Sequence, residues 1–541
     1  MIGVIADPKE HDVVREFFEL FKTPWEFYRK GEHYDALVCT GDGQFDSAAK
    51  VVVYYSGRSI QLDVEKNVKT LPQRKNCILS YQTDRIPIYG DSLTFPEKET
   101  AFLTEEDSRS CAAFMDQSND GVLVRVGYDL FDEVRTLLTV GQPPVNANIP
   151  ALELHIALLR NLLTGCGLSV VEIPPVPSGY PFIACLTHDV DHPSVRRHKW
   201  DHTILGFLYR AVFGSLSRLI RGRISIRDFV WNCAAALKLP FVYLGLAKDF
   251  WRDFDDRYLE LEKDLPSTFF VIPFKNCAGH TPHGPAPAFR AARYEAQDIA
   301  DTIQKFISAG REVGLHGIDA WLDRSKGREE VEEVRRVTGA SEIGARMHWL
   351  YQDDESPALL EEAGAAYDST IGYNETVGYR SGATQVYKPL TAKRLLELPL
   401  HAMDTALFYP DHLGLSPRQA QKLLNQLRDN AIRFGGCLTI NWHDRSLAPE
   451  RLWGECYRSV IKDLRERNAW ISTAGAAVAW FRKRRAATFE RDYTRRGEVR
   501  ITVPDTHRNG LPGLRLRVHK AREVSAMSSQ GSHDYVDSAV E

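Results

Sequence analysis

The feature that most constrains the fold is a short apolar run that passes directly into acidic and imidazole side chains. Residues 182–192 read Phe-Ile-Ala-Cys-Leu-Thr-His-Asp-Val-Asp-His, so the run ends on Asp189 and Asp191. Such a run is typical of a buried parallel strand, and in α/β proteins ligands gather beyond the carboxyl ends of these strands. Alternate aspartates with flanking histidines suit a divalent cation and a general base. The segment therefore predicts a functional site, with a solvated turn after a strand as the simpler alternative.

The same order recurs along the chain, with room for a helix between one apolar run and the next. Six further runs that end in polar residues lie at 267–273, 312–319, 344–349, 366–370, 395–404 and 437–444. Helical patterns between them lie at 294–309, 356–365, 416–434 and 448–468. Alternating strands and helices predict a parallel sheet, and this number of units predicts a distorted (β/α) barrel of seven or eight strands. The polar strand ends would then converge on one face of the barrel.

Five short motifs, taken in order, resemble a known family. They are Thr187-His-Asp-Val-Asp191, Ser267-Thr-Phe-Phe-Val271, Gly314-Leu-His316, Arg346 and Trp442-His-Asp444. In this order they resemble the polysaccharide deacetylases of carbohydrate esterase family 4, the NodB-homology domain, over roughly 180–480. The resemblance implies a distorted (β/α) barrel that removes acetyl groups from N-acetylated sugars with one divalent metal ion. Zinc is the expected metal, with cobalt, manganese or nickel as alternatives.

The two aspartates take different roles under this resemblance. Asp189 matches the general base of the family, which takes a proton from the metal-bound water. Asp191 resembles the metal-binding carboxylate, but the common family pattern has adjacent aspartates and this chain places Val190 between them. Alternate residues of an extended strand share a face, so both carboxylates can face one site.

The histidine pair of the family is incomplete in this chain. His316 matches the first histidine of the family's His-x-x-x-His motif, whereas the second position is Ala320. A catalytic zinc has about three protein ligands and a water, so a further ligand is needed. We predict His348, which ends the next predicted strand; its alternative role is stacking beside Trp349. Weaker candidates for this ligand are His188, His192 and Asp319.

The resemblance also assigns proton donation and orientation. His443 matches the general acid that protonates the departing amine. A neighbouring carboxylate, Asp368 or Asp404, is expected to hold its pKa near the working pH. Arg346 matches an arginine that orients the catalytic aspartate by a charge-assisted hydrogen bond, with a salt bridge at the barrel rim as the alternative.

Trp442 and Arg380 are the predicted sugar contacts, and Asn441 is a further candidate. Each of the three is equally consistent with a structural role. Asp444 is expected to fix the turn that follows His443.

Amide hydrolysis requires an activated water, a polarised acyl oxygen and a proton for the leaving nitrogen. Together with a metal ion, this residue set supplies all three. We therefore predict a metal-dependent carbohydrate N-deacetylase, a hydrolase of C–N bonds other than peptide bonds, acting on a surface glycan or its precursor. One alternative is a catalytically inactive carbohydrate-binding or scaffold protein on the same barrel. Another is a hydrolase of a non-sugar amide. The sequence contains no Gly-x-Ser-x-Gly and no Cys-x-x-Cys, which disfavours a serine hydrolase and a zinc finger.

The chain is expected to have four consecutive parts. Residues 1–170 predict a small α/β domain of unknown role, 171–181 a Pro-rich linker, 182–485 the barrel with an insertion at about 194–262, and 486–541 a C-terminal appendage. In the first part we expect strands at 2–5, 36–39, 51–55 and 121–127 and helices at 11–21 and 150–164. In the last part we expect a hairpin of 498–503 with 514–518 and a disordered tail at 524–541.

Composition limits the partners and the compartment. A net charge of −4 argues against nucleic acid as the main partner. Nine cysteines without paired spacing, and an N-terminus without a basic leader and apolar core, predict a cytoplasmic protein with reduced thiols. Residues 203–223 combine apolar residues with several arginines, so they predict either a peripheral contact with the inner face of the membrane or a helix packed on its own domain.

Overall fold

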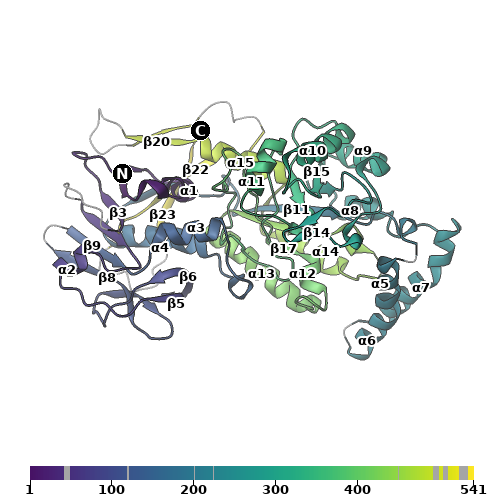
Figure 1. Cartoon of the computed structure of the whole chain (residues 1–541), viewed down its shortest axis with the longest axis horizontal. Helices are drawn as coiled ribbons and strands as arrows, with labels where there is room; N and C mark the ends of the chain where they lie inside the picture. Colours follow the sequence, from purple (N-terminus) through teal and green to yellow (C-terminus); the bar gives the residue numbers. More distant parts are fainter. Residues whose placement is uncertain are drawn as a thin grey trace. The chain divides into compact units, whose positions relative to one another are not determined.

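The computed structural model describes residues 1–541 except 42–48, 119–120, 200, 223, 449, 492–498, 504–509, 523–533 and 541. The chain forms two compact units (Figure 1). The first unit contains residues 1–179, 379–390 and 479–541, and the second contains 180–378 and 391–478. The sequence predicted four consecutive parts, and it did not predict that residues 379–390 belong to the first unit.

A nine-stranded sheet forms the centre of the first unit. Its parallel half contains, in spatial order, β2 (Trp25–Phe27), β1 (Ile2–Ile5), β3 (Ala36–Thr40), β4 (Val51–Tyr55) and β9 (Gly121–Val126). Its antiparallel half continues with β8 (Cys111–Ser118), β7 (Ala101–Glu105), β5 (Arg74–Tyr81) and β6 (Asp84–Ser92). The helices are α1 (His11–Phe21), α2 (Gln61–Glu65), α3 (Leu130–Leu138) and α4 (Ala151–Gly165). The predicted strands and helices of this region are confirmed.

The antiparallel half was not predicted, and the burial of its strands explains why. The buried side chains of α1 recur at helical spacing, at Val13, Val14, Phe17 and Phe21 among others, which gives a clear sequence signal. In contrast, β5 begins with three exposed residues and then buries only alternate ones. Its longest apolar run is Cys77-Ile78-Leu79, which is too short to predict a strand.

The C-terminal segment corrects two predictions. β22 (Leu514–His519) pairs antiparallel with β10 (Val170–Glu172) and with β23 (Tyr535–Val540), not with 498–503. The strand at that position, β21 (Val499–Thr502), pairs instead with β20 (Thr488–Arg491). β23 also shows that part of the predicted disordered tail is a strand, whereas 523–533 and 541 lie outside the described residues. Alternating apolar residues predict a strand but do not specify its partner, which accounts for both corrections.

Seven parallel strands form the sheet of the second unit. Six follow the spatial order β16 (Ala345–Met347), β15 (Glu312–Gly317), β12 (Thr268–Val271), β11 (Ile183–Val190), β18 (Cys437–Asn441) and β17 (Ala402–Met403). The seventh, β19 (Trp470–Ser472), pairs with the first half of β11. Isolated parallel bridges continue past β16, from Ala345 to Asp368 and from Asp368 to Glu397. Glu397 thus continues the sheet at the β16 edge, while Met403 belongs to β17 at the other edge. Because one short stretch of chain reaches both edges, the sheet curls, in agreement with the predicted α/β barrel class.

The register of this sheet brings polar strand ends together. All eight residues of β11 are buried, and Thr187 pairs with Thr268 on one side and with Asn441 on the other. His316 pairs with Arg346 in the next pair of strands. Since all these strands are parallel, their carboxyl ends meet at one edge. The predicted strands at 366–370 and 395–404 are shorter than expected, reduced to bridges and to β17.

Helices connect these strands. They are α9 (Ala300–Ser308), α10 (Arg324–Thr338), α11 (Ser356–Ala363), α12 (Asp404–Phe408), α13 (Pro417–Phe434), α14 (Gly454–Glu466) and α15 (Ala474–Ala486), the last of which ends in the first unit. The side chain of Ser416 accepts a hydrogen bond from the Gln419 backbone and so caps the start of α13. Gly435, at φ 83°, ends the same helix directly before β18.

The insertion after β11 is helical. It contains α5 (His202–Tyr209), a π-helical turn (Arg210–Gly214), α6 (Ser215–Ile220), α7 (Ile226–Tyr243) and α8 (Phe254–Leu261). In Figure 1, α5, α6 and α7 extend away from the barrel of the second unit. The helix over His202–Ile220 is, in the described part of the chain, the one long and apolar enough to cross a membrane by length and composition.

Candidate active site

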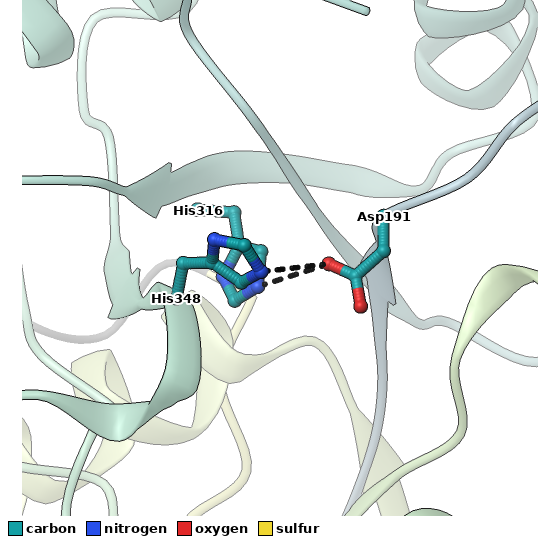
Figure 2. Close-up of side chains that lie close together, drawn as sticks. All are labelled: Asp191, His316 and His348. Atoms are coloured by element: carbon teal, nitrogen blue, oxygen red, sulfur yellow. Dashed lines mark ion pairs between the residues drawn. The ribbon is translucent and has the colours of Figure 1, made fainter. Parts of the chain in front are cut away.

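Three side chains from three strand ends converge on one point (Figure 2). Asp191 Oδ1 lies 3.4 Å from His316 Nε2 and 3.7 Å from His348 Nε2. The three ligand atoms all lie within 4.8 Å of one another. Zinc ligands lie about 2.0–2.2 Å from the ion, so the ligand atoms of one ion are about 3–4 Å apart. The spacing therefore fits a single metal ion.

Further observations show that this residue set fits a cation. Asp191 Oδ1 is buried and has no hydrogen-bond partner in the described residues. Burial by itself would raise the pKa of Asp191, but His316, His348 and His443 lower it well below its ordinary value, so the carboxylate is ionised. Two imidazoles and one carboxylate with further positions open are the ligand set of a catalytic zinc. These three residues are the predicted ligands.

The two histidines are held in ligating orientations. His316 Nδ1 lies 3.0 Å from the Arg346 carbonyl oxygen, a contact that favours the proton on Nδ1 and leaves Nε2 free as a ligand. Burial lowers the pKa of His348 to about 3, so its imidazole is neutral. Trp349, directly after His348, adopts φ 67° and ψ 16°, a left-handed conformation that few non-glycine residues take. This strained turn aims His348 into the site.

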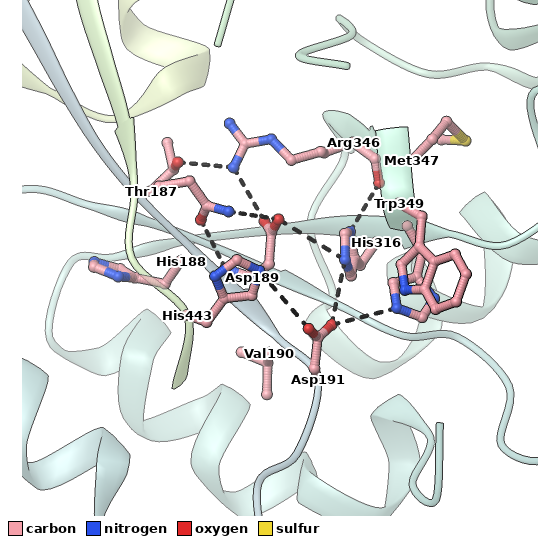
Figure 3. A network of polar contacts seen from close by, with 12 residues as sticks. Thr187, His188, Asp189, Val190, Asp191, His316, Arg346, Met347, Trp349 and His443 are labelled. Atoms are coloured by element: carbon pink, nitrogen blue, oxygen red, sulfur yellow. Dashed lines mark hydrogen bonds and ion pairs between the residues drawn. The ribbon is translucent and has the colours of Figure 1, made fainter. Parts of the chain in front are cut away.

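Asp189 occupies a separate position beside these ligands (Figure 3). Its Oδ1 accepts a hydrogen bond from Arg346 Nη1 at 3.0 Å, and its Oδ2 accepts one from Asn441 Nδ2 at 2.7 Å. Burial would raise the pKa of Asp189, but the charges of Arg346 and two histidines outweigh it and lower the pKa. The carboxylate is therefore ionised and fixed in direction, as a general base requires.

Arg346 is wholly buried, which excludes a salt bridge at the rim of the barrel. Besides Asp189, its guanidinium donates hydrogen bonds to Thr187 Oγ1 at 2.8 Å, to the Ser369 carbonyl oxygen at 3.0 Å and to Ser369 Oγ at 2.9 Å. A planar guanidinium held by four such contacts has one orientation. Arg346 can thus position Asp189.

His443 lies close to one of these ligands, Asp191. Its Nδ1 lies 2.6 Å from Asp404 Oδ1, and its Nε2 lies 3.8 Å from Asp191 Oδ2. Burial would lower the pKa of His443, but the Asp404 carboxylate and its hydrogen bond outweigh burial and raise the pKa to about 10. Of the two predicted partners, Asp404 is therefore the one in place. Asp368 instead pairs with Glu397, and its pKa is raised to about 6 by burial.

The weaker ligand candidates lie elsewhere. His188 points away from the site in Figure 3, and its Nε2 lies 2.8 Å from Glu262. His192 Nδ1 contacts His198 Nε2 at 3.1 Å. Asp319 is occupied by His280 and by Lys326, each at 2.8 Å. Asp444 accepts hydrogen bonds from the backbone of His192 and Arg445, which agrees with the predicted role in the turn.

Neither of the two predicted sugar contacts, Trp442 and Arg380, is among the residues that line the cavity over the site. Trp442 has no exposed surface, and its indole stacks on Tyr457 with ring centroids 5.2 Å apart, so it belongs to the core. Arg380 belongs to the first unit, where its carbonyl oxygen accepts a hydrogen bond from the Gln142 backbone. Trp442 follows the strand-end motif in sequence, but its side chain packs in the core, which spacing alone does not reveal. Asn441, in contrast, contacts Asp189 directly.

A cavity of about 760 Å³ opens over the site. This volume is typical of a small-molecule site. Its walls include residues that the sequence did not single out, namely Phe289, Trp349, Tyr351, Tyr409, Arg445, Arg451 and Trp453. Aromatic rings and cations of this kind carry no periodic signal in the sequence, because they come from loops that follow different strands.

Comparisons with known proteins complete the description. No protein-family model and no curated protein sequence matches the chain. A solved structure described as a polysaccharide deacetylase from Mycobacterium smegmatis is 18% identical and covers 57% of this chain and 95% of its own, with a TM-score of 0.35. Another so described, from Pseudomonas aeruginosa PAO1, is 15% identical and covers 57% and 94%, with a TM-score of 0.36.

The carbohydrate deacetylase Agd3 is 8% identical and covers 96% of this chain and 91% of its own, with a TM-score of 0.35. The matched structures also include pseudoenzymes of carbohydrate esterase family 4. Structures of carbohydrate esterase family 4, the family that the motifs of the sequence resemble, are thus among those that the chain matches.

Proposed function

We propose that the protein is a metal-dependent hydrolase that removes an acetyl group from an N-acetylated sugar. The observation that carries this proposal is the placement of three groups of different chemistry around one point. Asp191, His316 and His348 can hold an ion, while Asp189 and His443 each lie 3.8 Å from an atom of one of these ligands. A metal site, an ionised base and a protonated acid are the parts that amide hydrolysis needs.

The ligand set is the basis for proposing zinc. Two imidazoles and a carboxylate with open positions suit zinc, with cobalt, manganese and nickel as the next candidates. When bound, the ion supplies a Lewis acid that polarises the acyl oxygen and lowers the pKa of water. The contact of His316 Nδ1 with the Arg346 carbonyl oxygen supports the use of His316 Nε2 as a metal ligand.

The chain's own groups then move the protons. The ionised Asp189, oriented by Arg346 and Asn441, takes a proton from the attacking water. The protonated His443, whose Nδ1 is held by Asp404, donates a proton from Nε2 to the nitrogen of the leaving amine. The products are acetate and a free amino sugar, so the two proton transfers balance the addition of one water across the amide bond.

Two measurements test this proposal together. Purified protein stripped with a chelator and then incubated with zinc should hold about one ion per chain by elemental analysis. It should then release acetate from N-acetylated sugars of a panel that includes monomers and oligomers. A wild-type protein that stays metal-free contradicts the proposal. A protein that binds metal and sugar but releases no acetate supports the inactive carbohydrate-binding alternative, and release of acetate only from non-sugar amides supports the third.

We also propose that the reaction takes place in the cytoplasm. The nine cysteines are free thiols, and seven of them are buried. Buried thiols without partners are common in reducing compartments. Cell fractionation with thiol labelling tests this proposal, and recovery of the native protein in the external medium with disulfides would contradict it.

A further inference from the structure

Exposed apolar side chains are concentrated in the helical insertion of the second unit. Twelve of the twenty exposed large hydrophobic residues in the described part of the chain lie between 205 and 246, each 42–78% exposed. They are Leu205, Tyr209, Phe213, Leu216, Ile220, Ile226, Val230, Trp231, Leu237, Phe241, Leu244 and Leu246. The first five recur at intervals of three or four residues, which places them on one face of the 202–220 helix. We call residues 202–246 the helical hairpin.

This exposed face is not the face that packs on the protein. The opposite side of the hairpin contributes Ile204, Phe207, Ala211, Leu239 and Val242, among others, to a buried cluster. Its own domain therefore covers one face of each helix and leaves the other bare. Soluble monomers rarely expose a large contiguous apolar patch unless it binds something.

The charges around this face indicate what it binds. Between residues 202 and 248 the sequence has seven lysines and arginines and one acid, Asp228, whereas the whole chain has a net charge of −4. An apolar face with flanking cations and an exposed tryptophan fits the interface of a bilayer that contains anionic lipid. A second copy of the hairpin would bring like charges together, which disfavours a dimer on this face.

We propose that the helical hairpin docks on the surface of an anionic membrane. It lies on the bilayer rather than spanning it, because one side of both helices is already buried in the protein. His202, at the start of α5, lines the catalytic cavity, so docking brings the mouth of the site to the lipid surface. Membrane docking by the helical hairpin does not require the catalytic reaction.

Sedimentation of the full-length protein with vesicles tests this docking. Wild-type protein should cosediment with vesicles that contain phosphatidylglycerol, bind neutral phosphatidylcholine vesicles more weakly, and be released by salt. Trp231 fluorescence should shift to shorter wavelength on binding. The exposed-residue double variant Phe213→Ser/Trp231→Ser should bind at least about tenfold more weakly, because both apolar side chains leave water when the face docks.

The control is Val64→Ser/Val145→Ser, which removes two exposed apolar side chains outside the hairpin. It should bind like wild type. Both double variants should keep their metal content and acetate release in solution, which separates this test from that of the proposed function. Vesicle binding that is absent in wild type, or unchanged in Phe213→Ser/Trp231→Ser, overturns the proposal. If the wild-type protein forms concentration-dependent dimers and Phe213→Ser/Trp231→Ser abolishes them, the exposed face binds a second copy of the chain instead of a membrane.

An independent observation concerns the cationic side chains in the wall of the cavity. Arg445 and Arg451 line it, and neither makes an ion pair in the described residues. The Arg451 side chain is 2% exposed, and its Nε and Nη1 have no hydrogen-bond partner. Its guanidinium lies 4.7 Å from the Trp453 ring centroid and 5.0 Å from that of Tyr409. A buried cation without a counter-ion is costly unless a ligand supplies one.

The neighbouring tyrosine reports the positive field. Burial would raise the pKa of Tyr409, but Arg451, Arg445 and Arg210 outweigh burial and lower it. The acid next to Arg451, Glu450, accepts a hydrogen bond from Trp251 Nε1 at 2.9 Å and makes no ion pair with Arg451 in the described residues. Burial would lower the pKa of Arg451, but Tyr409 and Glu450 outweigh burial and raise it. The cavity wall thus carries carboxylates at Asp189 and Asp191 and guanidinium groups at Arg445 and Arg451.

We infer that Arg445 and Arg451 bind an anionic group, a phosphate, on the sugar whose amide is hydrolysed; this inference rests on the proposed function. Guanidinium groups donate paired hydrogen bonds to phosphate oxygens, and two of them suit a phosphate, which carries a charge of about −2 as a monoester and less as a diester. A lipid-linked sugar phosphate and a soluble sugar phosphate share this chemistry. The tests below distinguish them.

Equilibrium binding to the Asp189→Asn protein tests the subsite without turnover. N-acetylglucosamine 1-phosphate should bind more tightly than N-acetylglucosamine, and Arg445→Gln should remove about tenfold or more of that difference, because hydrogen bonds to charged groups are strong. Arg451→Lys should remove part of it. Arg467→Gln, at an exposed arginine of the same unit, is the control.

Thermal melting of each variant separates lost binding from lost folding. Equal affinity for both sugars in Asp189→Asn protein, or a preference for the phosphate that Arg445→Gln leaves unchanged, overturns the inference. Acetate release from a polyprenyl-linked sugar phosphate in vesicles, but not from the soluble phosphate, assigns the lipid-linked source, and the reverse assigns the soluble one.

Discussion

Two buried histidine–carboxylate pairs lie near β11, and only one of them faces the cavity. In the first, His443 Nδ1 contacts Asp404 at 2.6 Å, and Nε2 points toward Asp191 in the cavity. In the second, His188 uses both ring nitrogens inside the protein, with Nδ1 2.8 Å from the Trp442 carbonyl oxygen and Nε2 2.8 Å from Glu262.

The difference shows what turns such a pair into a reactive group. In both pairs a carboxylate is kept ionised by its histidine, since the pKa values of Asp404 and Glu262 are lowered although burial would raise them. The His443 ring keeps one nitrogen for a ligand, whereas the His188 ring has none left and no exposed surface. We therefore expect the first pair to affect turnover and the second to affect stability.

The largest effect should come from His443→Gln. Loss of the general acid should lower kcat by about 10²–10⁴-fold, because general acid–base groups contribute this much. Metal content and the unfolding midpoint should change little. Steady-state acetate release measures kcat, elemental analysis measures the metal content, and an unfolding curve gives the midpoint. The same loss of kcat in His188→Gln protein that remains folded would break the distinction between the two pairs.

Asp404→Asn should have a smaller effect with a distinct pH signature. The Asp404 carboxylate raises the pKa of His443 to about 10, so the acid form is lost only as the pH rises through that value. Removing the negative charge lowers this pKa, and the alkaline limb of the kcat profile should move to lower pH. A profile measured from neutral to alkaline pH checks the shift, and an unmoved limb would remove Asp404 from this role.

Glu262→Gln should destabilise the second unit without a matching loss of turnover. One partner of a buried charged contact is then left facing a neutral amide, at a cost of about 1–3 kcal/mol. Denaturant unfolding measures the loss, and kcat of the folded fraction should remain within a few fold of wild type. A large fall in kcat with unchanged stability would show that this pair also serves the reaction.

The smallest effect is the pH dependence of that stability difference. The pKa of Glu262 is lowered from 4.5, since the charge and hydrogen bond of His188 outweigh burial. Its contribution is therefore present above that value and is lost as the pH falls through the lowered folded pKa. The difference in unfolding free energy between wild type and Glu262→Gln should shrink from about pH 7 to about pH 3. A difference that grows with acid would contradict the assigned pair.

The helical and buried parallel parts of the fold could be predicted from the sequence because their burial is periodic or continuous. β11 is buried along its whole length, and α13 is preceded by the capping residue Ser416 and followed by Gly435. The antiparallel strands of the first unit and the partner of β22 could not be predicted, because strand pairing is a long-range choice that local pattern leaves open.

For the site, spacing on one strand determined that Asp189 and Asp191 share a face, and the motif order selected His316, Arg346 and His443. Only the tertiary structure decided the rest. It selected Asp404 rather than Asp368 as the partner of His443, and it buried Trp442 in the core. Those outcomes depend on which strand ends become neighbours in a curled sheet and on which side of each turn a side chain falls, and neither quantity is encoded in the local sequence.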